Sequence, residues 1–110
     1  MLHTDHTLNR LCKTWQRRLR LLDWHVTVRI ASAEEMGDEV GHIEYDDEEI
    51  WATIRLLDHP EIEATLVHEL LHLRLDKWPV EYHDHEKEKA INLLAACFMR
   101  AYPRRKKKQL

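Results

Sequence analysis

Residues 61–77 read EIEATLVHELLHLRLDK, and this stretch decides the fold because it predicts a helix that is apolar on almost every side. The apolar residues that cover its circumference are Leu66, Val67, Leu70, Leu71, Leu73 and Leu75. A helix of this kind lies at the centre of a domain. Pro60 suits its first turn, and residues 78–80 (WPV) end it. We therefore expect the rest of the chain to pack around this helix.

The segments around the central helix predict an α+β domain with the element order αβββαα. Residues 4–22 have apolar residues three and four apart, which predicts an amphipathic first helix capped by Thr4 or Asp5. Alternating apolar residues over 24–31 predict a strand, and residues 41–45 and 50–57 predict two more. Helical spacing over residues 84–102 predicts the last helix. We expect a small three-stranded sheet packed on the first and central helices.

Length and composition limit the class of protein. A chain of 110 residues has room for one core, so we expect a single domain over residues 1–103 and a basic tail over 104–110. No apolar run approaches the roughly 20 residues that span a membrane. Cys12 and Cys97 lack CxxC spacing, which predicts buried free thiols in a reducing compartment. With no secretory signal at the N-terminus, we expect a cytoplasmic protein without a membrane partner.

One pair among the nine histidines has the spacing of metal ligands. Residues 68–72 read HELLH, an HExxH pattern, and on a helix this spacing lets His68 and His72 reach one zinc ion. Glu69 can reach a zinc-activated water and act as general base. Asp76 could orient a histidine. Alternatively, both histidines are hydrogen-bonded core or rim residues, but polar residues on a buried helix need partners, which a metal site supplies.

Two histidines leave a zinc ion short of a protein ligand, and the last helix offers the third. The candidates are Glu81, His83, His85, Glu86 and Glu88. Glu88 lies one turn before the core-facing Ile91 and should point inward, whereas Glu86 is rotated by about 200° from it. His85 could be a substitute ligand or donate to a developing oxyanion. Each candidate could instead be a solvated charge at the start of a helix.

These segments resemble the minimal gluzincin-type HExxH zincins of phages and mobile elements, including peptidases that cleave phage or transposon repressors. In that family the next helix carries an ExxAN motif, which residues 88–92 (EKAIN) match with Ile91 in place of the alanine. The resemblance covers roughly residues 24–99 and implies a zincin-like fold with Glu88 as third zinc ligand. It also implies that an extended polypeptide substrate binds at a sheet edge, here residues 50–57. The interval from His72 to Glu88 is shorter than in longer members.

Three classes of function are open at this point. The first is a zinc metallopeptidase, in which His68, His72 and Glu88 hold Zn²⁺ and Glu69 is the general base. The second is a zincin-fold, metal-binding regulatory module with little turnover, whose basic tail would contact nucleic acid or another partner. The third is a metal-dependent hydrolase of a non-peptide bond. The presence of Glu69 favours an enzyme, because metal binding alone needs no general base.

Overall fold

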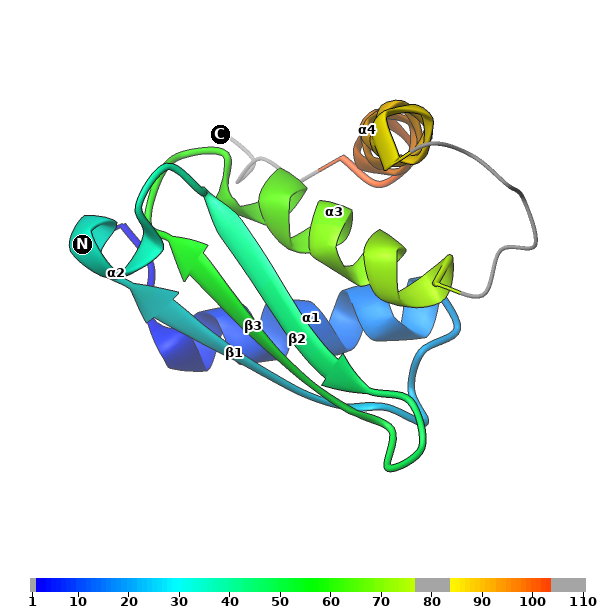
Figure 1. Cartoon of the computed structure of the whole chain (residues 1–110), viewed down its shortest axis with the longest axis horizontal. Coiled ribbons are helices and arrows are strands. Elements are labelled where there is room, and N and C mark those ends of the chain that lie inside the picture. The colour runs from blue at the N-terminus through cyan, green and yellow to red at the C-terminus, as the bar shows by residue number, and fades with distance from the viewer. Residues whose placement is uncertain (1, 77–83, 104–110) are drawn as a thin grey trace, which may run out of the picture.

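The computed structural model describes residues 2–76 and 84–103. These residues form α1 (Asp5–Arg18), β1 (His25–Ala31), α2 (Ala33–Met36), β2 (Gly41–Asp46), β3 (Trp51–Leu57), α3 (Ile62–Arg74) and α4 (Asp84–Ala101). The predicted α+β class and αβββαα order are confirmed (Figure 1). The short α2, capped by Ser32, lies where the sequence predicts only a connection. The predicted basic tail lies outside the described residues.

The sheet has the strand order β1-β3-β2, with β1 parallel and β2 antiparallel to β3. β3 is therefore the central strand, and the expectation that residues 50–57 offer a free sheet edge is wrong. A strand's two-residue period assigns its side chains to faces, but it carries no information about the neighbouring strands. The edge strand that packs against α3 is β2 (Figure 1).

One face of the sheet is apolar and meets the helices. Val28, Ile54 and Ile43 lie side by side across the three strands on this face. α1 packs on β1, and α3 packs on β2 and β3. The adjacent row on the opposite face holds Arg55, with Arg29 and His42 as its neighbours. The alternation predicted for a half-buried sheet is thus present.

The outer edge of β1 is occupied by side chains of α1. Asn9 accepts a hydrogen bond from the Val28 N–H at 2.9 Å and donates to the Val28 carbonyl at 2.7 Å. Asp5 accepts a hydrogen bond from the Ile30 N–H at 2.8 Å. These are the backbone groups that a further strand would need. α1 therefore closes one of the two edges of the sheet.

α1 ends earlier than the predicted boundary at residue 22. The helix stops at Arg18, and Arg20 adopts a left-handed conformation with a φ of 62°. The fully buried Gln16 donates to the carbonyl oxygens of Leu21 and Trp24 at 3.0 and 2.9 Å. The buried amide thus fixes the turn that leads into β1.

α3 is the buried central helix that its sequence predicts. Ile62, Leu66 and Leu70 have no exposed surface, and the sheet, α1 and α4 all contact this helix. In Figure 1, α3 lies across the view and α4 is seen almost end-on beside it. Within the ranges described, no helix is both long enough and apolar enough to cross a bilayer.

The C-terminal half of α4 docks on α1 through aromatic rings. The rings of Phe98 and Tyr102 lie edge-on to Trp15, with centroid separations of 6.5 and 5.7 Å. The guanidinium of Arg18 lies over the rings of Trp15 and Tyr102. The C-terminal end of α4 is thereby held by α1, and the helix also packs against α3.

The two thiols differ in environment. Cys12 is buried, as predicted, and burial raises the pKa of its thiol to about 12. Cys97 is exposed, so the prediction that it is buried is wrong. α4 buries Ile91 and Ala95, and a residue two positions after Ala95 lies on the other side of a helix.

Candidate metal centre

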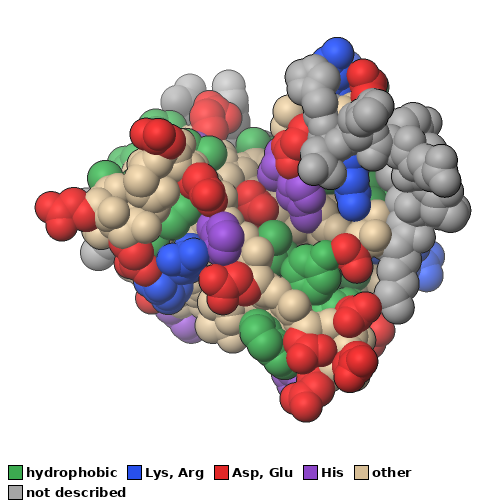
Figure 2. All heavy atoms as spheres, in the orientation of Figure 1, with side chains coloured by type: hydrophobic (Ala, Val, Ile, Leu, Met, Phe, Trp, Pro, Cys, Tyr) green, Lys and Arg blue, Asp and Glu red, His purple; other side chains and the backbone are tan. Residues whose placement is uncertain are grey.

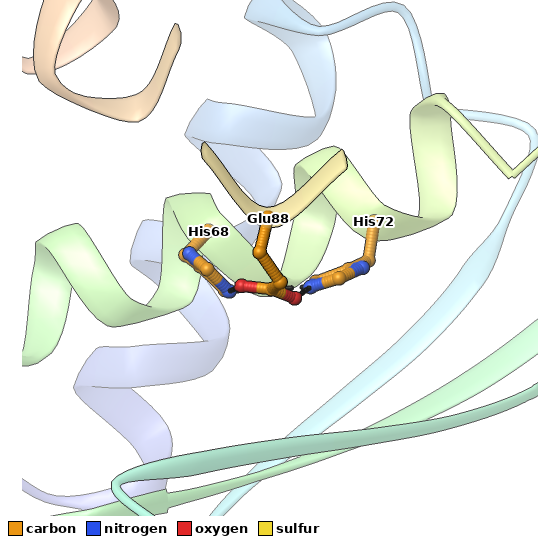
Figure 3. Close-up of side chains that lie close together, drawn as sticks. All are labelled: His68, His72 and Glu88. Carbon is orange, nitrogen blue, oxygen red and sulfur yellow. Dashed lines mark hydrogen bonds and ion pairs between the residues drawn. The ribbon is translucent and has the colours of Figure 1, made fainter. Parts of the chain in front are cut away.

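Three side chains from two helices meet beside the sheet. His68 and His72 lie one turn apart on α3, and their Nε2 atoms are 3.2 Å apart. Glu88 reaches across from α4, with Oε2 3.2 Å from His68 Nε2 and Oε1 2.6 Å from His72 Nε2 (Figure 3). The structure therefore brings together the three residues that the sequence suggests as ligands.

The donor set fits a zinc ion. Two ligands that lie about 2.0–2.1 Å from a tetrahedral ion are about 3.3 Å apart, close to the separation of the two Nε2 atoms. Two imidazoles and one carboxylate form a set used by catalytic zinc sites, which keep a further position for water or substrate. Among the side chains that the structure describes, in residues 2–76 and 86–103, this is the only group of three or more His, Cys, Asp or Glu residues whose ligand atoms converge, all within 4.8 Å.

The protonation state of His72 suits a ligand. Burial is the main cause that lowers the pKa of this imidazole, and the neighbouring His68 acts in the same direction. The carboxylate of Glu88 opposes the shift. A lowered pKa keeps the ring neutral at physiological pH, and only the neutral ring can donate a nitrogen lone pair to a metal.

Glu69 lies beside the three ligands. Its side chain lines the same pocket and the residue is only 7% exposed. Burial, with smaller contributions from the charges of Glu88 and Glu39, raises the pKa of its carboxyl to about 7. Among the residues described, we find no hydrogen bond or ion pair to this carboxylate. A buried carboxylate with free acceptor atoms can take a proton from a molecule that enters the pocket.

No protein-family model, curated protein or solved structure matches this chain. Any functional proposal therefore rests on the sequence pattern and on the chemistry of the site.

The other residues singled out in the sequence lie elsewhere. Glu86 is exposed on α4 and is not part of the converging group, as its helical rotation predicts. Glu81, His83 and the side chain of His85 lie outside the described residues, so their suggested roles stay predictions.

Asp76 does not orient a metal-binding histidine as suggested. Its carboxylate accepts a hydrogen bond from the hydroxyl of Tyr45 on β2. Burial, together with this carboxylate, raises the pKa of the Tyr45 phenol to about 12. Asp76 thus links the end of α3 to the edge strand.

The three ligands line a pocket of about 810 Å³. The pocket lies between residues 61–72 of α3 and its N-terminal flank, one side of α4, and residues 38–43 at the start of β2. Sequence reasoning missed this last segment. One signal was available: Gly41 is one of only two glycines in the chain, and a glycine within a strand often marks a close approach of the backbone to another group.

Gly41 is such a close approach. A Cβ atom at this position would lie 2.6 Å from Thr65 Cγ2 and 2.9 Å from Glu69 Oε2. The missing side chain therefore lets β2 run directly against the face of α3 that carries the candidate general base.

Proposed function

We propose that the chain is a zinc-dependent metallopeptidase of the HExxH type, which hydrolyses peptide bonds. The observation that supports this most is the convergence of His68, His72 and Glu88 on a large pocket, with Glu69 buried beside them. The resemblance to minimal zincins supports the same assignment. When bound, zinc supplies a Lewis acid that polarises a carbonyl group and makes water more acidic.

The residues of the chain have separate roles in this proposal. His68, His72 and Glu88 hold the ion. Glu69 accepts a proton from the attacking water and passes it to the nitrogen of the leaving amine. Its burial disfavours the charged form and so makes the carboxylate more basic than an exposed one.

The polypeptide substrate binds, in this proposal, as an additional strand on β2. β2 is an edge strand, and Gly41, His42 and Ile43 line the pocket. The other sheet edge, on β1, is occupied by Asp5 and Asn9. Backbone pairing at a sheet edge recognises extended peptides largely independently of their side chains. β2 therefore replaces residues 50–57 as the expected docking strand.

The alternative is a metal-binding regulatory module with little turnover. A module of that kind would need the three ligands, but it would need neither a buried general base nor a pocket beside the ligands. The enzyme is therefore the better supported function. We place it in the cytoplasm, in that of the host if the chain is phage-encoded, where its two free thiols stay reduced.

Replacement of Glu69 tests the proposal. Glu69→Gln keeps the size of the side chain and removes its basicity, so zinc content should stay near one per chain. Cleavage of a mixed peptide library, followed by mass spectrometry, should fall by about 10²–10⁴-fold. Glu86→Gln, on the exposed side of α4, is the matched control and should cleave like the wild type. Undiminished cleavage by Glu69→Gln, or no cleavage by the zinc-loaded wild type, would contradict the proposal.

A further inference from the structure

The pocket beside the candidate metal centre is lined by apolar and acidic residues in addition to the three ligands. Part of its wall is apolar and is formed by small or flexible side chains, namely Ala64, Ala95, Ala96 and Met99. Asp38, Glu39 and Glu61 add carboxylates where the chain enters β2 and α3. In Figure 2, acidic side chains, drawn red, surround the hollow beside the purple histidines. The pocket therefore combines an apolar wall with an acidic rim.

The described lining of this pocket contains acidic side chains but no lysine or arginine. Counted with Glu69 and Glu88, this lining has five carboxylates. Lys87 lies close enough to lower the pKa of His72, but it is not part of the lining. His42 forms a hydrogen bond with Glu39 at 3.1 Å, so one lining histidine is already held by the acidic rim. A bound zinc ion would offset the charges of Glu69 and Glu88, so the excess negative charge of the pocket comes from Asp38, Glu39 and Glu61, and this rim attracts cations.

Two observations indicate an organic cation with an apolar part. The carboxylates of Asp38, Glu39 and Glu61 do not converge as metal ligands, because His68, His72 and Glu88 form the one converging group among the described residues. The volume of about 810 Å³ is in the range of pockets that enclose small organic molecules. Glu69, the candidate general base, is buried in the wall of the same pocket and has no hydrogen-bonding partner among the described residues.

We propose that the pocket receives a lysine or arginine side chain of the substrate, so that the enzyme cleaves beside basic residues. The aliphatic stem of such a side chain packs on Ala64, Ala95 and Met99, and its charged end reaches the carboxylates of the rim. This inference rests on the proposed peptidase function and adds the class of substrate to it.

Matched peptides test the preference. Four peptides share one sequence and differ only at a residue next to the cleaved bond, which is lysine, arginine, norleucine or glutamate. We expect kcat/KM for the lysine and arginine peptides to exceed that for norleucine by about tenfold at low salt, since three partly exposed carboxylates act together. The glutamate peptide should be the poorest substrate. The preference should shrink at high salt, because exposed charges are screened.

Two variants with the same change of charge separate the pocket from the net charge of the protein. The triple variant Asp38→Asn, Glu39→Gln, Glu61→Gln should lose most of the preference for lysine over norleucine. The control variant Glu34→Gln, Glu48→Gln, Glu49→Gln removes three exposed acidic charges outside the pocket and should keep the preference. If the triple variant unfolds, as judged by circular dichroism, the single Glu39→Gln variant should still lower the ratio.

Binding and cleavage together distinguish the two proposals. Labelled lysine and norleucine peptides are titrated into zinc-loaded Glu69→Gln protein and followed by fluorescence anisotropy. Tighter binding of the lysine peptide supports the proposal that the pocket receives a basic side chain. This holds even if no peptide is cleaved, an outcome that would overturn only the peptidase function. Equal binding of the two peptides, or a preference that survives in the triple variant, would overturn the proposal that the pocket receives a basic side chain and leave the peptidase function standing.

Discussion

Gly41 is the residue at which the edge strand and the candidate catalytic machinery touch. A side chain here would collide with Thr65 and with the carboxylate of Glu69. We expect Gly41→Ala to displace Glu69 or lift β2, and so to lower peptide cleavage by about tenfold or more, because small misplacements of a catalytic group are costly. Zinc content should not change, since the three atoms nearest to a Cβ at this position belong to Thr65, Glu69 and Leu56 and to none of the three ligands. Steady-state cleavage and elemental analysis measure the two effects.

Gly37 provides the control for this substitution. It has a φ of 64°, a conformation that disfavours side chains, but nothing lies within 4 Å of a Cβ atom there. Gly37→Ala should therefore destabilise the protein by about 1–3 kcal/mol through backbone strain while cleavage is retained. If Gly37→Ala and Gly41→Ala impair cleavage equally, the contact with Glu69 is not the cause.

The ligand residues could be suggested from the sequence, whereas the rest of the pocket could not. The four-residue spacing of His68 and His72 places them on one face of their helix, and the three-residue spacing of Glu88 and Ile91 does the same. Helical spacing alone therefore predicts which way these side chains point. Asp38 and Glu61 give no such signal. Their place on the pocket depends on how β2 and α4 lie against α3, which is a property of packing between distant segments.

The role of β2 as the edge strand beside the pocket could not be predicted from the sequence. Its strand pattern is shorter and weaker than that of β1, yet it forms the sheet edge beside the pocket. The strand boundaries follow from alternation, but the order β1-β3-β2 does not, because β3 inserts between two strands that precede it in the chain. The order is decided by which pairings bury the apolar face under α1 and α3.

If the substrate pairs with β2, every second backbone N–H of the substrate should form a hydrogen bond with this strand. The Val40 carbonyl accepts from the Leu57 N–H, so by antiparallel alternation the backbone groups of Gly41, Ile43 and Tyr45 face the free edge. A substrate strand should therefore use every second backbone N–H. In a cleaved peptide with single N-methyl groups, kcat/KM should fall by roughly threefold to tenfold at alternate positions.

The positions between them give the internal control. Their N–H groups would point away from β2, so N-methylation there should change kcat/KM little. A uniform loss at every position would show that methylation acts through the shape of the peptide, and an absence of loss anywhere would argue against strand pairing. Chromatographic assays of each peptide supply the rates.

At the scale of the molecule, the candidate centre joins two layers of the fold. His68 and His72 belong to α3 and Glu88 to α4, so a bound ion would tie α4 to the core at the end away from Phe98 and Tyr102. Binding to the folded state alone stabilises it by about 4 kcal/mol when the free ligand is at 1,000 times its Kd. A chelator should accordingly lower the Tm of the zinc-loaded protein by roughly 10 °C or more.

Two variants of α4 test whether the chelator lowers the Tm by removing zinc from the site that includes Glu88. Glu88→Ala should bind zinc far more weakly and show little further loss of Tm with chelator, whereas Glu86→Ala should behave like the wild type. Differential scanning calorimetry with and without EDTA, together with a zinc count per chain, gives both results. A chelator response that persists in Glu88→Ala would remove Glu88 from the ligand set and direct attention to His85.

The hydrogen bonds between the backbone of β1 and the side chains of Asp5 and Asn9 also bear on how the protein associates. A sheet that is open at both edges can add strands from copy after copy, which is the route to fibres. With β1 closed by α1, β2 is the one remaining edge of this sheet as the structure describes it, and growth ends after one addition. The hydrogen bonds that close β1 leave β2 as the single edge where a peptide can pair. They also prevent the sheet from extending into a fibre.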